Sequence, residues 1–170
     1  RSLFKNNPAP MLLIDPATAR IVDSNDAAVL FYGYPADVLS SMKVTELNTL
    51  PEKDVFDEMA SALSLEKNSF RFTHRLADGT LKSVEVLSNP IVMGENTLLY
   101  SVVCDVTERK RMEEELIRER EEQLLLFDSI PLIIFFKNRR NRYVRVNRAF
   151  CDFFGLSKKQ VEGSTAWELF

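Results

Sequence analysis

Hydrophobic and polar residues follow two different periods along the first hundred residues. Two short apolar segments, MLLID at 11–15 and RIVDSN at 20–25, flank a turn that begins with proline, a pattern typical of a β-hairpin. Residues 51–66 (PEKDVFDEMASALSLE) place an apolar residue every three or four positions, which predicts an amphipathic helix. After residue 68 the period falls to two. Three segments then alternate as strands do: SFRFTHRL, LKSVEVLSNPI and TLLYSVVCDV.

The segment between the hairpin and the amphipathic helix predicts several short helices. Asn25 is a suitable N-cap, because its side-chain oxygen can accept from free N–H groups of the next turn. Gly33 can end that helix in the left-handed conformation. PADVLS and VTELN each allow a further turn of helix. The order of two strands, several helices and three strands predicts an α+β fold, a five-stranded antiparallel sheet with helices on one face.

Residues 107–127 (TERKRMEEELIREREEQLLLF) predict one continuous helix, because they contain neither glycine nor proline. Glu114 and Arg118 are a favourable pair four positions apart. Met112, Leu116 and Leu126 give a thin apolar seam, which allows a short coiled coil. A solvated single helix has the same pattern, and both interpretations stay open.

After this helix the opening elements return. With an offset of 122 residues, positions 25–48 match positions 147–170, and NDAAVLFYGYP at 25–35 corresponds to NRAFCDFFGLS at 147–157. The chain therefore contains an internal repeat, and the period of this repeat is one domain. The second copy ends after its short helices and cannot form the complete sheet.

Composition is that of an ordinary globular protein, with 45% hydrophobic and 28% charged residues and a net charge of −3. No apolar run approaches the roughly 20 residues that a membrane-spanning helix needs. The chain does not begin with Met, so we expect a longer parent protein, and any membrane anchor would lie outside this sequence. Cys104 and Cys151 show no metal-binding or redox spacing, which predicts buried, reduced thiols and a cytoplasmic location.

Several classes of function find no support in the residues. The chain has one histidine, so it lacks a His-rich metal cluster or a catalytic set. Its five glycines are scattered as turn residues and make no phosphate-binding loop. Residues 137–148 (KNRRNRYVRVNR) are basic, but they predict a solvated hairpin, and we expect no nucleic-acid binding. The chain itself is therefore not expected to be an enzyme.

The order of the hairpin, the Asn-capped helix, HRLADGT at 74–80 and CDVTERK at 104–110 resembles the PAS family of sensory domains. The resemblance implies a complete PAS-like domain at 1–107, a signalling linker helix at 108–126 and the N-terminal half of a second PAS-like domain at 127–170. It also implies a segment of a bacterial multidomain signalling protein. The output domain would lie in the same chain and would be a histidine kinase of a two-component system or a diguanylate cyclase.

Relatives in this family often enclose a small cavity between the sheet and the helices, which could hold a small ligand. Periodicity does not fix which alternation of each strand faces inward, and a filled core would have the same composition. The candidates for the pocket are Phe31, Phe56, Met59, Phe70, Phe72, His74, Val86, Ser88, Tyr100 and Val102.

The resemblance also allows the family's known cofactors to be compared with this sequence. Haem is disfavoured because residues 51–66 contain no histidine, and covalent flavin is disfavoured because SSMKVTELN at 40–48 contains no cysteine. A small organic ligand, or none, is the expectation.

The resemblance places a signal junction at Asp105 and Thr107, where the last strand meets the long helix. Thr107 is expected to cap the helix and Asp105 to pair with a basic group such as Arg109 or Lys110. A ligand, redox or partner signal would pass through this junction into the helix. Two capping residues without a signalling role are the simpler interpretation. A homodimer is expected for this chain. The competing function is a ligand-free module for protein–protein interaction, which dimerises through its domains or its helix.

Overall fold

The computed structural model describes residues 2–170, with the backbone alone for Ser2 and Leu3. The chain divides into two compact units, one that extends to Arg111 and one that comprises Met112–Phe170. The helices and strands of the first unit, up to the long helix, are α1 (Ser2–Lys5), β1 (Met11–Ile14), β2 (Ile21–Ser24), α2 (Asp26–Tyr32), α3 (Ala36–Leu39), α4 (Val44–Leu47), α5 (Glu52–Leu63), β3 (Ser69–Arg75), β4 (Leu81–Met93) and β5 (Asn96–Asp105).

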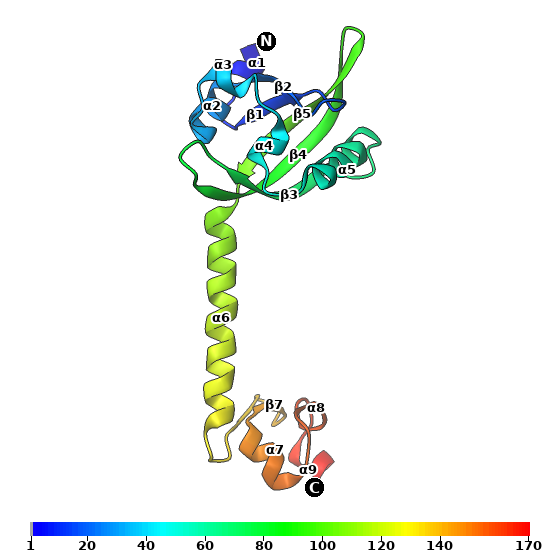
Figure 1. The fold of residues 1–170 in the computed structure, drawn as a ribbon. Helices are drawn as coiled ribbons and strands as arrows, with labels where there is room; N and C mark the ends of the chain where they lie inside the picture. The colour runs from blue at the N-terminus through cyan, green and yellow to red at the C-terminus, as the bar shows by residue number, and fades with distance from the viewer. Residues whose placement is uncertain (1) are drawn as a thin grey trace. The chain divides into compact units, whose positions relative to one another are not determined.

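The strands of the first unit pair as one antiparallel sheet in the order β2-β1-β5-β4-β3. β1 therefore lies beside β5, which brings the two ends of the unit together, as the element order predicts. Helices α2 to α5 cover one face of this sheet (Figure 1). The α+β fold with a five-stranded sheet is confirmed for the described residues.

The core of the first unit lies between this face and the helices. The helix α5 contributes Val55, Met59 and Ala62, which recur at the spacing of one helical face. Leu12 and Ile14 of β1 meet them from the sheet, because alternate residues of a strand point to the same face. Tyr100 points to the opposite face, where its ring lies 6.2 Å from the ring of Phe4 in α1.

The helix α6 (Thr107–Ser129) begins two residues after β5 ends and has no buried residue along its length. It extends two residues beyond the predicted end at residue 127, through Asp128 and Ser129. It contributes its first residues to the first unit and the rest to the second. None of the helices in residues 2–170 is long and apolar enough to cross a membrane.

The second unit repeats the opening elements of the first at the predicted offset of 122 residues. Its elements after the long helix are β6 (Phe135–Lys137), β7 (Tyr143–Val146), α7 (Arg148–Phe154), α8 (Lys158–Val161) and α9 (Ala166–Leu169). The bounds of β7, α7, α8 and α9 are those of β2, α2, α3 and α4 plus 122. Its two strands pair with each other as a small antiparallel sheet.

The same asparagine organises both copies. Asn25 is fully buried; its Oδ1 accepts from Met11 N and Ala28 N, both at 2.9 Å, and its Nδ2 donates to two carbonyl oxygens, of Asn7 at 3.1 Å and of Ala9 at 2.8 Å. Asn147 makes the equivalent four bonds in the second unit. One amide thus caps a helix and fixes the strand before it, which explains why the repeat preserves this residue type.

The two cysteines differ from the expectation of burial. Both are free thiols; Cys104 is exposed and Cys151 is partly exposed. Cys104 lies one residue before the end of β5 and points to the face of the sheet that α2 to α5 do not cover, because Val103 points into the core.

Candidate functional site

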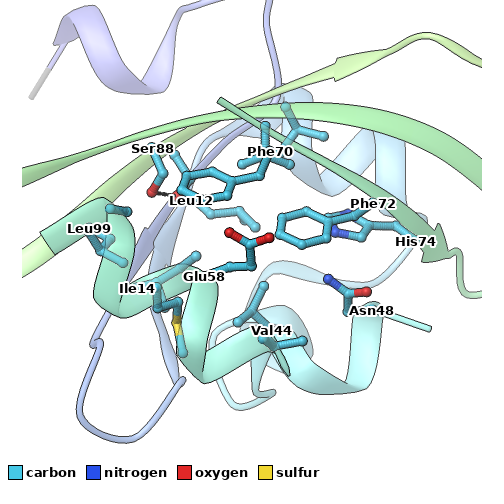
Figure 2. Close-up of a pocket in the computed structure, with 16 residues that line it drawn as sticks. Leu12, Ile14, Val44, Asn48, Glu58, Phe70, Phe72, His74, Ser88 and Leu99 are labelled. Atoms are coloured by element: carbon cyan, nitrogen blue, oxygen red, sulfur yellow. Dashed lines mark hydrogen bonds between the residues drawn. The ribbon is translucent and has the colours of Figure 1, made fainter. Parts of the chain in front are cut away.

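The first unit contains a small cavity between the sheet and the helices (Figure 2). Its volume is about 40 Å³, which is room for roughly three water molecules. The walls are mainly apolar and come from both layers of the unit; they comprise Leu12, Ile14, Val44, Asn48, Val55, Glu58, Met59, Ala62, Phe70, Phe72, His74, Val86, Ser88, Leu99, Ser101 and Val103.

The pairing of the strands determines which side chains reach the cavity. The alternation Phe70, Phe72, His74 on β3 faces inward, as do Val86 and Ser88 on β4. On β5 the inward residues are Leu99, Ser101 and Val103. The structure therefore places six of the predicted residues at the cavity: Met59, Phe70, Phe72, His74, Val86 and Ser88.

Tyr100 and Val102 do not line the cavity, in contrast to the expectation for them. The register pairs Ser88 with Ser101, so Ser101 shares the inward face and its two neighbours point to the other face. There the Tyr100 hydroxyl lies 2.9 Å from the sulfur of Met11. Strand alternation alone gives two solutions for β5, and only the register with β4 distinguishes them.

Phe31 and Phe56 also lie outside the cavity lining. Phe31 packs edge-on against Tyr32, with ring centroids 4.9 Å apart, and contacts the side of the core. Phe56 follows Val55 by one position, which rotates it about 100° around α5. It is therefore partly buried at the rim of the core, while Val55 and Met59 face the sheet.

One end of the cavity is polar. The His74 side chain is 2% exposed, and its Nδ1 lies 2.9 Å from the Tyr32 hydroxyl. Burial lowers the pKa of His74 to about 4, so the imidazole is neutral near pH 7, and burial raises the pKa of Tyr32. Figure 2 shows Asn48 at the same end as His74. Asn48 comes from the segment between α4 and α5, which is tied to β3 by a hydrogen bond from Thr49 N to Thr73 O at 3.0 Å.

Two other polar groups border the cavity. The hydroxyls of Ser88 and Ser101 are hydrogen-bonded to each other across β4 and β5 at 2.8 Å, and both side chains are buried. The Glu58 carboxylate pairs with Lys67, at 3.0 and 3.1 Å. Glu58, Asn48 and Ser101 were missed from sequence. A polar residue in a helix or loop, such as Glu58 or Asn48, gives no periodic signal of its direction, and Ser101 belongs to the alternation of β5 that was not chosen.

The junction between β5 and α6 is held by side-chain contacts to β4. The Thr107 hydroxyl accepts from Ser83 N at 3.0 Å and donates to Ser83 O at 3.3 Å. Asp105, rather than Thr107, caps the helix, because its Oδ1 accepts from Thr107 N at 2.9 Å. The expectation that Thr107 caps the helix is therefore wrong: its hydroxyl forms hydrogen bonds with the backbone of Ser83 on the neighbouring strand.

Ion pairs extend this junction. Asp105 pairs with Lys82 on β4, with Nζ and Oδ2 3.0 Å apart, a partner that sequence reasoning did not identify. Burial alone would raise the pKa of Asp105, but the hydrogen bonds from Thr107 and Lys82 together outweigh it and lower that pKa. Arg109 of α6 pairs with Glu85 of β4 at 3.5 Å. The first turn of α6 is therefore attached to β4, the same strand that places Val86 and Ser88 at the cavity.

The predicted seam of α6 is exposed. Met112, Leu116 and Leu126 are 62%, 65% and 61% exposed, respectively. Such apolar positions on an otherwise charged helix are available to a partner.

Comparison with known proteins gives the class of this chain. Residues 1–106 match the family model of the PAS fold, and residues 127–170 match a second model described as a PAS fold. The chain therefore belongs to the PAS family of sensory domains.

Among individual proteins, the chain is 39% identical over 116 residues to the diguanylate cyclase DgcM of Escherichia coli (strain K12). That match covers 66% of this chain and 28% of the relative, so the chain spans little more than a quarter of it.

Solved structures confirm the fold. The PAS domain of a Desulfitobacterium hafniense protein has a TM-score of 0.58 at 16% identity and covers 62% of this chain and 99% of its own. The PAS domain of an HTR-like protein from Haloarcula marismortui has a TM-score of 0.56 at 20% identity, with 61% and 86% covered.

Proposed function

We propose that the chain is a sensory and signal-transduction module in which the state of the cavity is transmitted through β4 and β5 to α6. This proposal is supported by β4 and β5, because each of these strands both lines the cavity and contacts the start of α6. Leu99, Ser101 and Val103 line the cavity, and the same strand ends at Asp105, immediately before the helix. β4 lines the cavity with Ser88 and holds the helix start through Ser83. A movement of either strand at the cavity therefore changes the contacts of Thr107.

The proposed division of the chain follows from this role. Residues 1–107 would be the sensor, residues 108–126 the linker helix and residues 127–170 the first half of a second PAS domain. The two family matches support it, since they leave residues 107–126 between them. By its likeness to DgcM, the output domain in the parent protein would be a diguanylate cyclase, with a histidine kinase as the alternative. A cytoplasmic location for this module remains a prediction.

A cavity-altering substitution on β5 tests the transmission. Val103 is 1% exposed and lines the cavity, so Val103→Ile adds one methylene group there. The first hydrogen bond of α6 runs from Lys110 N to Val106 O at 2.9 Å, and amide exchange of Lys110 reports its opening. We expect Val103→Ile to change this exchange rate about fivefold, the lower end of ordinary coupling between sites.

The neighbouring residue provides the control. Val102→Ile adds the same group on the opposite face of β5 and should leave Lys110 exchange within about twofold of the wild type. Equal responses to both substitutions, or none to either, would contradict transmission from the cavity.

A second candidate function is dimerisation through α6, favoured by the exposed seam. In that case three substitutions, Met112→Glu, Leu116→Glu and Leu126→Glu, should convert a dimer into a monomer, because the buried seam could not accommodate the added charges. Analytical ultracentrifugation measures the change. Arg118→Glu alters charge on another side of the helix and should leave the dimer intact. A triple variant that stays dimeric would place the contact elsewhere.

A further inference from the structure

Two buried nitrogen atoms at the polar end of the cavity have no hydrogen-bond partner within the described residues: His74 Nε2 and Asn48 Nδ2. Both residues line the cavity and are 2% and 9% exposed. Buried polar groups in proteins are nearly always hydrogen-bonded, because an unsatisfied one is costly. Figure 2 shows the two side chains together, on the side of the pocket away from Ser88. Their common position indicates one shared partner inside the cavity.

The hydrogen bond on the other side of each group allows both atoms to be donors. The Tyr32 hydroxyl lies 2.9 Å from His74 Nδ1, and we assign the phenol as the donor, which places the imidazole proton on Nε2. Asn48 Oδ1 accepts from Leu50 N at 3.0 Å, which orients the amide with Nδ2 toward the cavity. The polar end therefore offers two N–H donors and requires an acceptor.

The charges around the cavity favour an acceptor without charge. Neither a Lys nor an Arg is among the described residues that line it, and Glu58 contributes a carboxylate at its border. His74 is neutral, because burial lowers its pKa to about 4. A buried anion would therefore have no counter-charge among the lining residues, because the nearby cation, Lys67, is already paired with Glu58. The remaining walls, among them Phe70, Phe72 and Leu99, suit a short hydrocarbon part.

We propose that the cavity binds a small uncharged carbonyl compound. Its oxygen accepts from His74 Nε2 and Asn48 Nδ2, and its hydrocarbon part lies against the apolar wall. The volume of about 40 Å³ restricts it to a few non-hydrogen atoms. This inference rests on the proposed sensory function of the cavity and specifies its ligand class.

Three probes of nearly the same shape test this class on the whole chain: acetone, acetate and 2-methylpropene. Acetone labelled with ¹³C at the carbonyl is titrated while the amide signals of the protein are recorded. We expect acetone to bind with a dissociation constant on the order of millimolar, as its few atoms allow, and its carbonyl signal to shift as hydrogen bonding requires. Acetate and 2-methylpropene should bind at least about tenfold more weakly, because one brings an uncompensated charge and the other no acceptor.

A pair of isosteric variants tests the donor that Asn48 contributes. Asn48→Asp keeps the oxygen that accepts from Leu50 N and removes the Nδ2 donor, so acetone should bind about tenfold more weakly. Asn89→Asp makes the same change at an exposed position and should have no effect. If Asn48→Asp does not fold, the carbonyl shift of acetone on the wild type still decides.

The outcomes separate this inference from the sensory function. Three results would overturn the carbonyl proposal. If 2-methylpropene binds as tightly as acetone, the cavity is purely apolar, and if acetate binds more tightly than acetone, the cavity is an anion site. If none of the three probes binds, the cavity holds water alone. If Val103→Ile still alters Lys110 exchange in those cases, the sensory function stands. If acetone binds as expected but neither it nor Val103→Ile changes Lys110 exchange, the ligand class stands and the sensory function fails.

Discussion

Replacing Asn25 by alanine should lower the free energy of unfolding of the first unit by about 3 kcal/mol. The substitution removes the N-cap of α2 and leaves the buried Met11 N–H without its partner. It also removes the two bonds that the Asn25 amide donates to Asn7 O and Ala9 O. Such a loss is a large fraction of the stability of an ordinary domain. Urea denaturation followed by the NMR amide signals of Leu12 and Leu99 measures it.

The control for Asn25 is an asparagine without these contacts. Asn96, the exposed first residue of β5, should tolerate alanine within about 0.5 kcal/mol. Asn147→Ala should destabilise the second unit and leave the Leu12 and Leu99 signals unchanged, since its four bonds lie within that unit. An Asn25→Ala protein as stable as the wild type would show that the asparagine does not organise the fold.

The first unit should lose about 3 kcal/mol of stability as the pH falls from about 6.5 to about 4. Burial lowers the pKa of His74 in the folded state, from an ordinary 6.5 to about 4. Between these values the unfolded chain binds a proton that the folded chain does not. The contribution of the neutral histidine to the stability of the first unit is therefore fully present above pH 6.5 and is lost progressively below this pH. Urea denaturation at a series of pH values measures the slope.

His74→Gln isolates this contribution, because glutamine can accept from the Tyr32 hydroxyl but does not titrate. The free energy of unfolding of this variant should depend less steeply on pH between 6.5 and 4, whatever its absolute stability. Carboxylates with lowered pKa, such as Asp15 and Asp105, act at lower pH and remain in both proteins. Identical slopes in the two proteins would mean that His74 is not buried in its neutral form.

The sequence was sufficient to predict the fold, because the relevant signals are local. The change of period after residue 68 separates helix from strand, and the Asn25 cap and the Gly33 terminus mark α2, with Gly33 at a φ of 75°. The repeat at an offset of 122 residues is reproduced by the element bounds and by the two asparagines. Each of these features depends on a few neighbouring residues.

The site could be predicted only in part, because it depends on register and on long-range pairing. The inward alternation of β3 and β4 contains the expected residues, but that of β5 is Ser101 and its alternate neighbours, not Tyr100 and Val102. Asn48 reaches the cavity through a loop, and Lys82 reaches Asp105 from a strand paired with β5. No local pattern encodes these directions.

A double-mutant cycle tests whether the cavity and the start of α6 are energetically coupled through Thr107. The four proteins are the wild type, Val103→Ile, Thr107→Val and the double variant, and the measured quantity is the opening free energy of the Lys110 amide by hydrogen exchange. Thr107→Val keeps the shape of the side chain and removes both bonds to Ser83. If the hydrogen bonds between Thr107 and Ser83 transmit the change at the cavity, the effects of the two substitutions should be non-additive by about 1 kcal/mol. Effects that add within about 0.3 kcal/mol would contradict the coupling and leave the cavity and the helix as independent parts of the domain.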